Sequence, residues 1–262
     1  MSFIGKRQNN CVAADSSTRI TTDFHAHVLP DIDDGSKSVN ESLEMLRMSY
    51  ESGVRRIVAT PHFYARYQNP ESFMKKRAEA IALLAHAMEN GRNNGDKYPE
   101  IILGAEVAYF DGISYCEEIR TFCVQGTRMV LVEMPFQRWD DRIINEMHDM
   151  KSSLNVIPVV AHVDRYFKTQ SAKMIKKLLD DDLLVQANAS SFINRQSRNR
   201  MMKWLLEDEI DFIGSDCHNT TCRQPNLDRA SQAISCMAGD KILTKINGFC
   251  DYVFNSTEVL TD

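Results

Sequence analysis

Histidines and carboxylates recur in this sequence at the ends of short apolar segments, where a buried strand would finish. Five of the seven histidines stand at or directly after such a segment, and acidic residues take the corresponding places after others. The residues are His25, His27, Asp34, His62, Glu106, Glu133, His162, Asp216 and His218. Imidazole and carboxylate groups are typical ligands of Mn, Fe and Zn. Their positions therefore predict a metal site assembled from segments that are distant in the sequence.

Two of the motifs share the same spacing. One residue separates His25 from His27, and one residue separates Asp216 from His218. Because side chains alternate along an extended strand, each pair projects to one side and can bind one ion. Nine ligands are too many for a single transition-metal ion and favour two or three divalent ions, with Mn, Fe or Zn expected rather than Ca. Closely spaced ions of this kind deprotonate a water near neutral pH and hold the oxygens of a substrate during displacement.

Two arginines follow predicted ligands closely. Arg165 comes three residues after His162, and Arg223 comes five residues after His218. Acidic ligands repel a phosphate dianion unless positive charge surrounds it, and guanidinium groups bind phosphate through paired hydrogen bonds. We therefore predict that Arg165 and Arg223 bind phosphate and act in catalysis together with Asp216. A surface ion pair is the alternative interpretation of each arginine.

Aromatic residues also follow several predicted ligands. For an ester with an aromatic leaving group, we expect them to flank that group, with ordinary loop packing as the open alternative. The residues are Phe63, Tyr64, Tyr67 and Tyr166. Glu133 or Asp216 is expected to relay a proton to the leaving oxygen, although a phenolate, whose pKa is about 10, leaves without a strong general acid.

The segment Cys217–Arg223 matches the Cys-x5-Arg spacing of thiol-based tyrosine phosphatases. That chemistry needs a glycine-rich loop whose amides surround the phosphate and lower the pKa of the thiol. No glycine lies between these two residues, and Cys217 falls inside the Asp216–His218 pair. We therefore disfavour a thiol mechanism.

The composition limits the class of protein. The chain has 262 residues, of which 43% are hydrophobic, and a net charge of −5. No apolar run approaches the ~20 residues of a membrane span, and the acidic balance argues against binding to nucleic acid. Residues 1–19 lack the apolar core of a secretory signal and are predicted to form a flexible polar tail before a single domain at 20–262. Seven cysteines without a repeated short spacing indicate reduced thiols and a cytoplasmic location.

Short apolar segments alternate with amphipathic helical patterns. Ser38 and Glu41 form a capping box, and Pro70 stands where the first turn of a long helix is expected. Repeated strand-and-helix units favour a barrel of parallel strands, with an open doubly wound sheet as the alternative. In a barrel the carboxyl ends of the strands meet on one rim, which would gather the predicted ligands. The predicted strands are Ile20–Phe24, Arg56–Thr60, Glu100–Gly104, Met129–Val132, Val156–Ala161, Leu184–Ala187 and Ile210–Gly214.

These motifs, in this order, resemble those of the polymerase-and-histidinol-phosphatase (PHP) superfamily. Within it, the sequence is most similar to the bacterial metal-dependent protein-tyrosine phosphatases of the CpsB/YwqE type. The resemblance extends from about Ile20 to near the C-terminus. The segments that carry it are Asp23-Phe-His-Ala-His27, Asp31-Ile-Asp-Asp-Gly35, Ala59-Thr-Pro-His62, Gly104-Ala-Glu106, Leu131-Val-Glu133, Ala161-His-Val-Asp-Arg-Tyr166 and Gly214-Ser-Asp-Cys-His218.

The resemblance implies an α/β fold, a distorted (β/α)7 barrel like the TIM barrel, with a trinuclear centre of Mn or Fe. It assigns the metal ligands to the nine residues named first and the phosphate-binding arginines to Arg165 and Arg223. It also implies hydrolysis of phosphotyrosine in proteins, by attack of a metal-bound hydroxide. The implied partners are tyrosine-phosphorylated tails of bacterial kinases that govern capsule and exopolysaccharide export. The polar residues 1–19 depart from the family's usual start.

Other functions fit parts of the same pattern. A phosphatase of a small phosphomonoester such as histidinol phosphate, or an amidohydrolase-like enzyme, would use the same rim. A phosphotyrosine-binding module without turnover would keep the arginines but would not need a complete set of ligands. A panel of substrates and a metal assay distinguish these alternatives.

Overall fold

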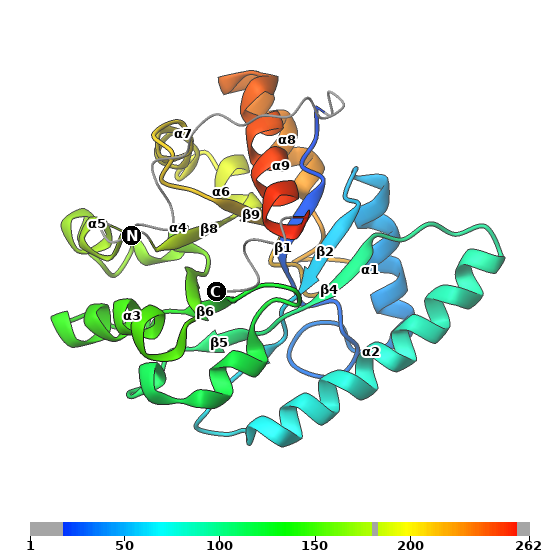
Figure 1. The fold of residues 1–262 in the computed structure, drawn as a ribbon. Helices are drawn as coiled ribbons and strands as arrows, with labels where there is room; N and C mark the ends of the chain where they lie inside the picture. The colour runs from blue at the N-terminus through cyan, green and yellow to red at the C-terminus, as the bar shows by residue number, and fades with distance from the viewer. Residues whose placement is uncertain (1–17, 180–182, 256–262) are drawn as a thin grey trace.

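The computed structural model describes residues 18–179 and 183–255, so residues 1–17 of the predicted tail lie outside the described part. Figure 1 shows the strands in the middle of the molecule with helices around them. All strand pairs between named strands are parallel. One sheet has the order β1 (Thr22–Ala26), β2 (Arg56–Ala59) and β4 (Glu100–Leu103). The other has the order β3 (His62–Phe63), β5 (Glu106–Ala108), β6 (Met129–Glu133), β7 (Ile157–Val160), β8 (Leu184–Asn188) and β9 (Phe212–Gly214).

All seven predicted strands are confirmed, with small shifts at their ends. The first strand begins at Thr22 rather than Ile20, because the Ile20 amide donates to the Ser231 hydroxyl (2.9 Å) and the Thr21 amide to the Asn247 side chain (3.0 Å). Strands β3 and β5 were not predicted. Each is a short continuation of the strand that precedes it in the chain, and each begins with a predicted ligand.

The segment after β9 lies beside β1. The Asp216 amide donates to the His25 carbonyl (2.7 Å), and the His27 amide donates to the Cys217 carbonyl (2.9 Å). Ala26 and Cys217 form an isolated parallel bridge. The parallel strands therefore form a half-barrel in which the first and last ligand segments of the chain are neighbours.

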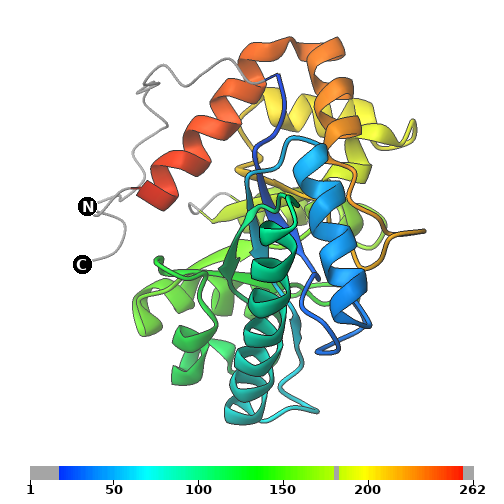
Figure 2. The same cartoon turned by 90° about the vertical axis from the view of Figure 1, so that its right-hand side faces the viewer.

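Helices follow the strands and cover their outer faces (Figure 1). The Ser38 hydroxyl accepts from the Glu41 amide (3.2 Å) at the start of α1 (Val39–Glu51), and Asn69 caps α2 (Pro70–Asn93). Figure 2 shows α1 and α2 running side by side. In the described part of the chain, no helix combines the length and the apolar character that crossing a bilayer requires. The helices are α1 (Val39–Glu51), α2 (Pro70–Asn93), α3 (Asp141–Leu154), α4 (Val163–Tyr166), α5 (Ala172–Leu179), α6 (Ala189–Ile193), α7 (Arg198–Leu206), α8 (Leu227–Ala238) and α9 (Asp240–Asn255).

Two apolar clusters hold the strands in place. The larger lies between the strands and the surrounding helices. The smaller includes Phe24, Leu131 and Phe212, and the rings of Phe24 and Phe212 stack with their centroids 3.7 Å apart. Because the apolar residues of the strands are buried in these clusters, the polar residues at the carboxyl ends can face one another.

Gly214, the last residue of β9, permits the close approach of β1. A Cβ atom there would lie 2.5 Å from the His25 Cβ and 2.7 Å from the His25 amide nitrogen. Real Cβ atoms do not approach other atoms so closely, so any side chain at this position must displace β1 together with His25.

We predict that Gly214→Ala destabilises the protein by about 1–3 kcal/mol, since the added methyl group overpacks a rigid contact. Gly248→Ala is the matched control, because nothing lies within 4 Å of a Cβ at this position in α9. That substitution should stabilise the helix by about 0.5–1 kcal/mol. Urea unfolding of the two variants measures both effects, and equal stability of Gly214→Ala and the parent protein would contradict the prediction.

Candidate metal centre

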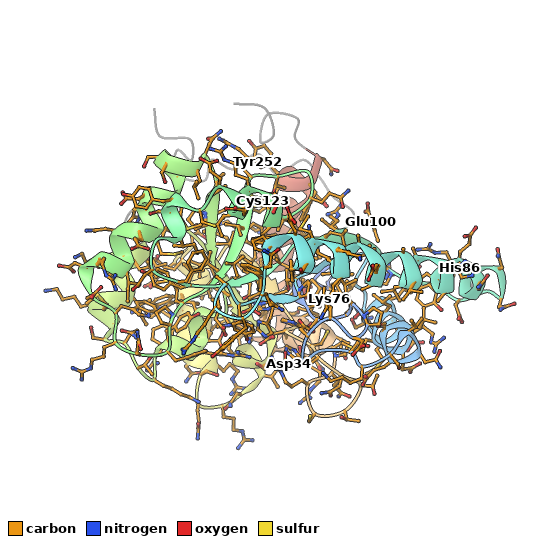
Figure 3. The ribbon with its side chains drawn as sticks, turned by 90° about the horizontal axis from the view of Figure 1, so that it is seen from below. Asp34, Lys76, His86, Glu100, Cys123 and Tyr252 are labelled. Atoms are coloured by element: carbon orange, nitrogen blue, oxygen red, sulfur yellow. The ribbon has the colours of Figure 1, made fainter. Side chains whose placement is uncertain are left out.

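The nine predicted ligands come together at the carboxyl ends of the strands. His25 lies in β1, His62 begins β3 and Glu106 begins β5. Glu133 ends β6, and the other ligands lie in the loops that follow β1, β7 and β9. In Figure 3, Asp34 lies in the lower half of the view, and Glu100, the first residue of β4, lies in the upper half. His86 in α2 lies far from Asp34 in the same view, as expected for a histidine in the middle of a helix.

Glu106 is at the middle of this cluster. Its Oε2 atom lies 3.1 Å from His25 Nε2, 3.2 Å from His27 Nε2 and 3.0 Å from His62 Nδ1. Its Oε1 atom lies 2.9 Å from His162 Nε2. The side chain is only 1% exposed, so a single buried carboxylate contacts four imidazoles.

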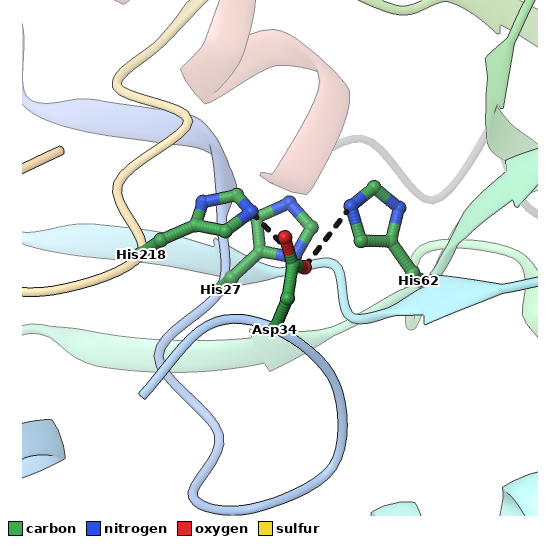
Figure 4. Close-up of side chains that lie close together, drawn as sticks. All are labelled: His27, Asp34, His62 and His218. Carbon is green, nitrogen blue, oxygen red and sulfur yellow. Dashed lines mark ion pairs between the residues drawn. The ribbon is translucent and has the colours of Figure 1, made fainter. Parts of the chain in front are cut away.

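The possible ligand atoms fall into three adjoining groups. Within each group they lie within 4.8 Å of one another. His27 and His62 each belong to two groups, so the groups are contiguous. Figure 4 shows the first group, in which Asp34 pairs with both His62 and His218. The groups are His27 with Asp34, His62 and His218; His25 with His27 and Asp216; and His62 with Glu106 and Glu133.

His162 lies beside the third group. Its Nε2 atom is 3.2 Å from Glu133 and 2.9 Å from Glu106. His162 (φ 32°) and Asp216 (φ 54°) both have left-handed backbone conformations. Non-glycine residues rarely adopt this region, and proteins tend to retain such strain at functional sites. The backbone at these two strand ends is therefore bent in a way that turns the side chains into the centre.

Gln186 selects the tautomer of the His25 imidazole. The His162 amide donates to Gln186 Oε1 (2.6 Å), and Gln186 Nε2 donates to Asn188 Oδ1 (3.1 Å), so the orientation of the Gln186 amide is defined. His25 Nδ1 lies 3.1 Å from the same Oε1 atom. Because this oxygen can only accept, His25 Nδ1 carries a proton. In the neutral imidazole, the Nε2 atom that faces the centre then has a free lone pair.

His27 is oriented in the same way by Asp33. Its Nδ1 atom lies 2.7 Å from Asp33 Oδ2, an acceptor, so this nitrogen also carries a proton. The Nε2 atoms of His25 and His27 are 3.1 Å apart, and both lie next to the Glu106 carboxylate. Lone pairs and a carboxylate approach this closely only when a proton or a metal cation lies among them. The donor set therefore fits a bound cation, and its nitrogen and oxygen atoms suit Mn, Fe or Zn.

The pKa shifts of the ligands also indicate a site for positive charge. Burial raises the pKa of Glu106, but the charge on His25 and the hydrogen bonds from the imidazoles hold it well below its usual range. Burial lowers the pKa of His27, but hydrogen bonds to Asp33 and Glu106 outweigh this effect and raise it to about 10. Burial, assisted by the charge on His27, lowers the pKa of His218 to about 4. The centre thus attracts positive charge and holds His218 neutral, the form in which it can bind a metal.

Arg165 and Arg223 both reach into the centre. The Nη2 atom of Arg223 lies 2.7 Å from Asp216 Oδ1, and Arg165 pairs with Oδ2 of the same carboxylate. Asn188 donates to that Oδ2 atom as well (2.9 Å). The arginine side chains are about one-third exposed, at 35% and 37%, so both can be reached from solvent.

Three residues near the ligands were missed by the sequence analysis. Asp33, Gln186 and Asn188 orient ligands through the hydrogen bonds described above. Gln186 and Asn188 are polar residues in a strand that is buried along its whole length, and this contrast is a signal that sequence inspection can detect. Asp33 lies in the acidic turn with Asp34, but the spacing does not reveal which carboxylate faces the metal site and which supports His27.

The prediction for the aromatic residues was partly wrong. Phe63 and Tyr166 are buried (1% and 0% exposed), because Phe63 packs on other core aromatics and the Tyr166 hydroxyl accepts from the Met134 amide (2.8 Å). The ring of Tyr64 is exposed and lies 5.1 Å from that of His62. Phe136, which was not predicted, is 46% exposed and lies parallel to the ring of His162 at 6.0 Å.

Cys217 is fully buried, and its burial raises the pKa of the thiol. A nucleophilic cysteine needs a thiolate in a partly exposed, electropositive environment. The structure therefore supports the earlier rejection of a thiol mechanism, and it also argues against ready oxidation of this residue.

The fold and the site define a parallel α/β protein whose strand ends gather imidazoles and carboxylates into a candidate centre for several metal ions. The chain belongs to the family described as "Capsular polysaccharide synthesis, CpsB/CapC", which it matches over residues 21–260. It is 28% identical over 227 residues to the tyrosine-protein phosphatase CpsB of Streptococcus agalactiae serotype III (strain NEM316), covering 81% of this chain and 88% of that protein. It is 24% identical over 208 residues to the tyrosine-protein phosphatase YwqE of Bacillus subtilis (strain 168), covering 77% of this chain and 78% of that protein.

A solved structure has the same fold. It comes from work on YwqE from Bacillus subtilis and CpsB from Streptococcus pneumoniae, described as unique metal-dependent tyrosine phosphatases. It superposes with a TM-score of 0.76 at 21% identity and covers 90% of this chain and 94% of its own. A lactonase from Listeria monocytogenes superposes with a TM-score of 0.56 at 11% identity, covering 94% of this chain and 96% of its own. The parallel arrangement of strands is thus shared beyond the family.

We predict that Gln186→Leu weakens Mn binding by about 10–100-fold, as is typical when the partner of a ligating histidine is removed. Gln170→Leu is the matched control, because Gln170 is also buried and its side-chain amide also makes two hydrogen bonds. It accepts from the Trp139 amide and donates to the Gln137 carbonyl. Titration calorimetry should show near-normal Mn affinity for the control. Unchanged affinity in Gln186→Leu would show that His25 does not depend on Gln186.

The stabilisation by metal should grow with pH. In metal-free protein, His27 and His162 have pKa values raised to about 10 and about 9, above the ~6.5 of an unfolded histidine. Their contribution to stability is therefore complete below about pH 6.5 and is lost as the pH rises through 9 to 10. A metal ion replaces these protons, so its binding is favoured by rising pH. Melting curves between about pH 6 and 8.5 should show a widening gap between Mn-loaded and EDTA-treated protein, and a constant gap would contradict this linkage.

Proposed function

We propose that this protein is a metal-dependent protein-tyrosine phosphatase that acts on a tyrosine-phosphorylated protein, a bacterial tyrosine kinase, in capsule or exopolysaccharide production. The proposal depends on the close approach of His25 Nε2 and His27 Nε2 to each other and to Glu106, an arrangement that needs positive charge at the centre, as protons or as metal ions. The substrate class is supported by the relatives CpsB and YwqE, which are named tyrosine-protein phosphatases, and the pathway by the family description. Six free thiols in the described residues are consistent with a cytoplasmic location.

The ligand assignment follows from the three groups of side chains. We infer three divalent ions, Mn or Fe with Zn as the alternative, one at each group, and His162 as a further ligand beside Glu106 and Glu133. When bound, such ions supply a deprotonated water near neutral pH and polarise the phosphate oxygens. The strand arrangement that holds them is proposed to be the distorted (β/α)7 barrel, in which β2 with β3 and β4 with β5 each count as one strand.

The two arginines provide the electrostatic part of the reaction. Arg165 and Arg223 are held next to the centre by Asp216, whose pKa is lowered by the charges of His25 and Arg165 even though burial alone would raise it. A bound phosphate offers the two guanidinium groups more negative charge than one carboxylate does. We propose that they rotate to its non-bridging oxygens and stabilise the charge that develops there, the dominant effect in phosphoryl transfer.

Glu133 is the preferred residue for moving a proton to the leaving phenolate. Both oxygens of Asp216 already accept hydrogen bonds, from Arg165, Arg223 and Asn188, so this carboxylate is poorly suited to carry a proton. Glu133 is partly exposed (13%) and has His162 Nε2 within 3.2 Å. The phenol itself is proposed to lie between Tyr64 and Phe136, whose exposed rings flank the centre beside His62 and His162.

Chelation should abolish hydrolysis of a phosphotyrosine peptide, and added Mn should restore it. Arg223→Ala should lower kcat/KM by about 10²–10³-fold, the typical effect of removing one group that stabilises transition-state charge, and it should leave the metal content unchanged. Loss of metal in that variant would show that the arginine is structural.

Cys217→Ser distinguishes this mechanism from the thiol mechanism. The hydroxyl fits the same buried space, so turnover should continue and remain sensitive to chelators. Loss of turnover in Cys217→Ser, combined with indifference of the parent enzyme to chelators, would overturn the metal mechanism.

A further inference from the structure

One side of the rim around the centre is basic. Five cations lie in the loops and helices that follow β6, β7 and β8. Four of them are exposed and Arg198 is half-buried. In the described part of the chain, none of the five has a carboxylate within 4.0 Å. We call this surface the basic rim, and its residues are Arg138, Lys168, Arg195, Arg198 and Arg200.

The topology places the basic rim on the same face as the metal centre. Helix α6 begins directly after the carboxyl end of β8, and α7 then returns the chain towards β9. The residues at the start of α7 are therefore on the carboxyl side of the strands. Arg195 lies in the turn between the two helices, and Arg198 and Arg200 lie in the first turn of α7.

A direct contact connects this surface to the segment that carries Arg165. The guanidinium of Arg200 lies over the ring of Phe167, 4.5 Å from its centroid, and that ring packs against Trp204 (4.8 Å). Phe167 directly follows α4, the short helix from which Arg165 reaches Asp216. Arg200 of the basic rim therefore contacts the residue that stands two positions after Arg165 in the chain.

The loop after β1, at another part of the rim, carries both charges. Asp31 and Asp34 are exposed there together with Lys37, and the protein as a whole has a net charge of −5. Charge patterns of this kind govern the orientation and the rate of association with a partner.

We propose that the basic rim binds acidic residues that flank the phosphotyrosine of the protein substrate, and that it orients the substrate chain across the β6–β8 side of the centre. The inference rests on the proposed function and adds a preference for acidic sequence. Each exposed ion pair is weak, so the contribution comes from several pairs acting together and decreases as salt rises.

Two phosphotyrosine peptides of equal length, one with Asp and Glu around the phosphotyrosine and one with Ala and Gly, provide the test. The double variant Arg195→Gln/Arg200→Gln should raise KM for the acidic peptide by about threefold to tenfold. It should leave kinetics with the neutral peptide and with p-nitrophenyl phosphate within about twofold. The control Lys97→Gln/Lys151→Gln removes the same charge at the amino ends of the strands, before β4 and β7, and should leave all three substrates unaffected.

Fluorescence anisotropy with the labelled acidic peptide tests the basic rim independently of turnover. If no substrate is hydrolysed but the variant still loses affinity for the acidic peptide, the proposed function fails and the inference about the surface survives. Equal effects on the acidic peptide and on p-nitrophenyl phosphate would overturn the inference, since they would indicate a disturbed centre. Unchanged peptide affinity with loss of binding to phosphatidylglycerol vesicles would overturn it in favour of a membrane surface.

Discussion

A buried carboxylate must be matched by positive charge, and in this protein that requirement is concentrated at Glu106. Removing an ion from water costs several kcal/mol even after relaxation, and the cost is offset only by close, well-oriented partners. Four imidazole nitrogens lie within 3.2 Å of Glu106, which is buried almost completely. Two of them, on His25 and His27, also hold a proton on the far side of the ring. The arrangement is stable only with protons or metal cations at its middle, and the rest of the site follows from that constraint.

The fold satisfies the constraint by using parallel strands. Their carboxyl ends reach one side of the molecule, so residues nearly 200 positions apart, such as His25 and Asp216, become neighbours. The contact is close because Gly214 has no side chain to separate β9 from β1. Asp33 and Gln186 then hold the imidazole rings with the correct nitrogen turned inward. Ligand position, backbone approach and proton placement are therefore three separate contributions to one site.

The strands and most of the ligand positions could be predicted from the sequence because they depend on local residue patterns. Apolar runs predicted seven of the nine strands in the described part of the chain, and the position of each histidine relative to its strand predicted which residues would meet. What could not be predicted depends on the direction of side chains in three dimensions. Phe63 and Tyr166 follow ligands in the sequence but turn into the core, whereas Phe136 turns to the surface. Short strands such as β3 have too few residues to show a periodicity at all.

The central claim is that these side chains share several divalent cations. Anomalous scattering from crystals grown with Mn measures this directly. The account predicts strong peaks at the three groups of ligands, each about 2.0–2.3 Å from imidazole nitrogens and carboxylate oxygens, with ions a few ångströms apart. A map without peaks at these positions, in protein that still hydrolyses phosphotyrosine, would contradict it.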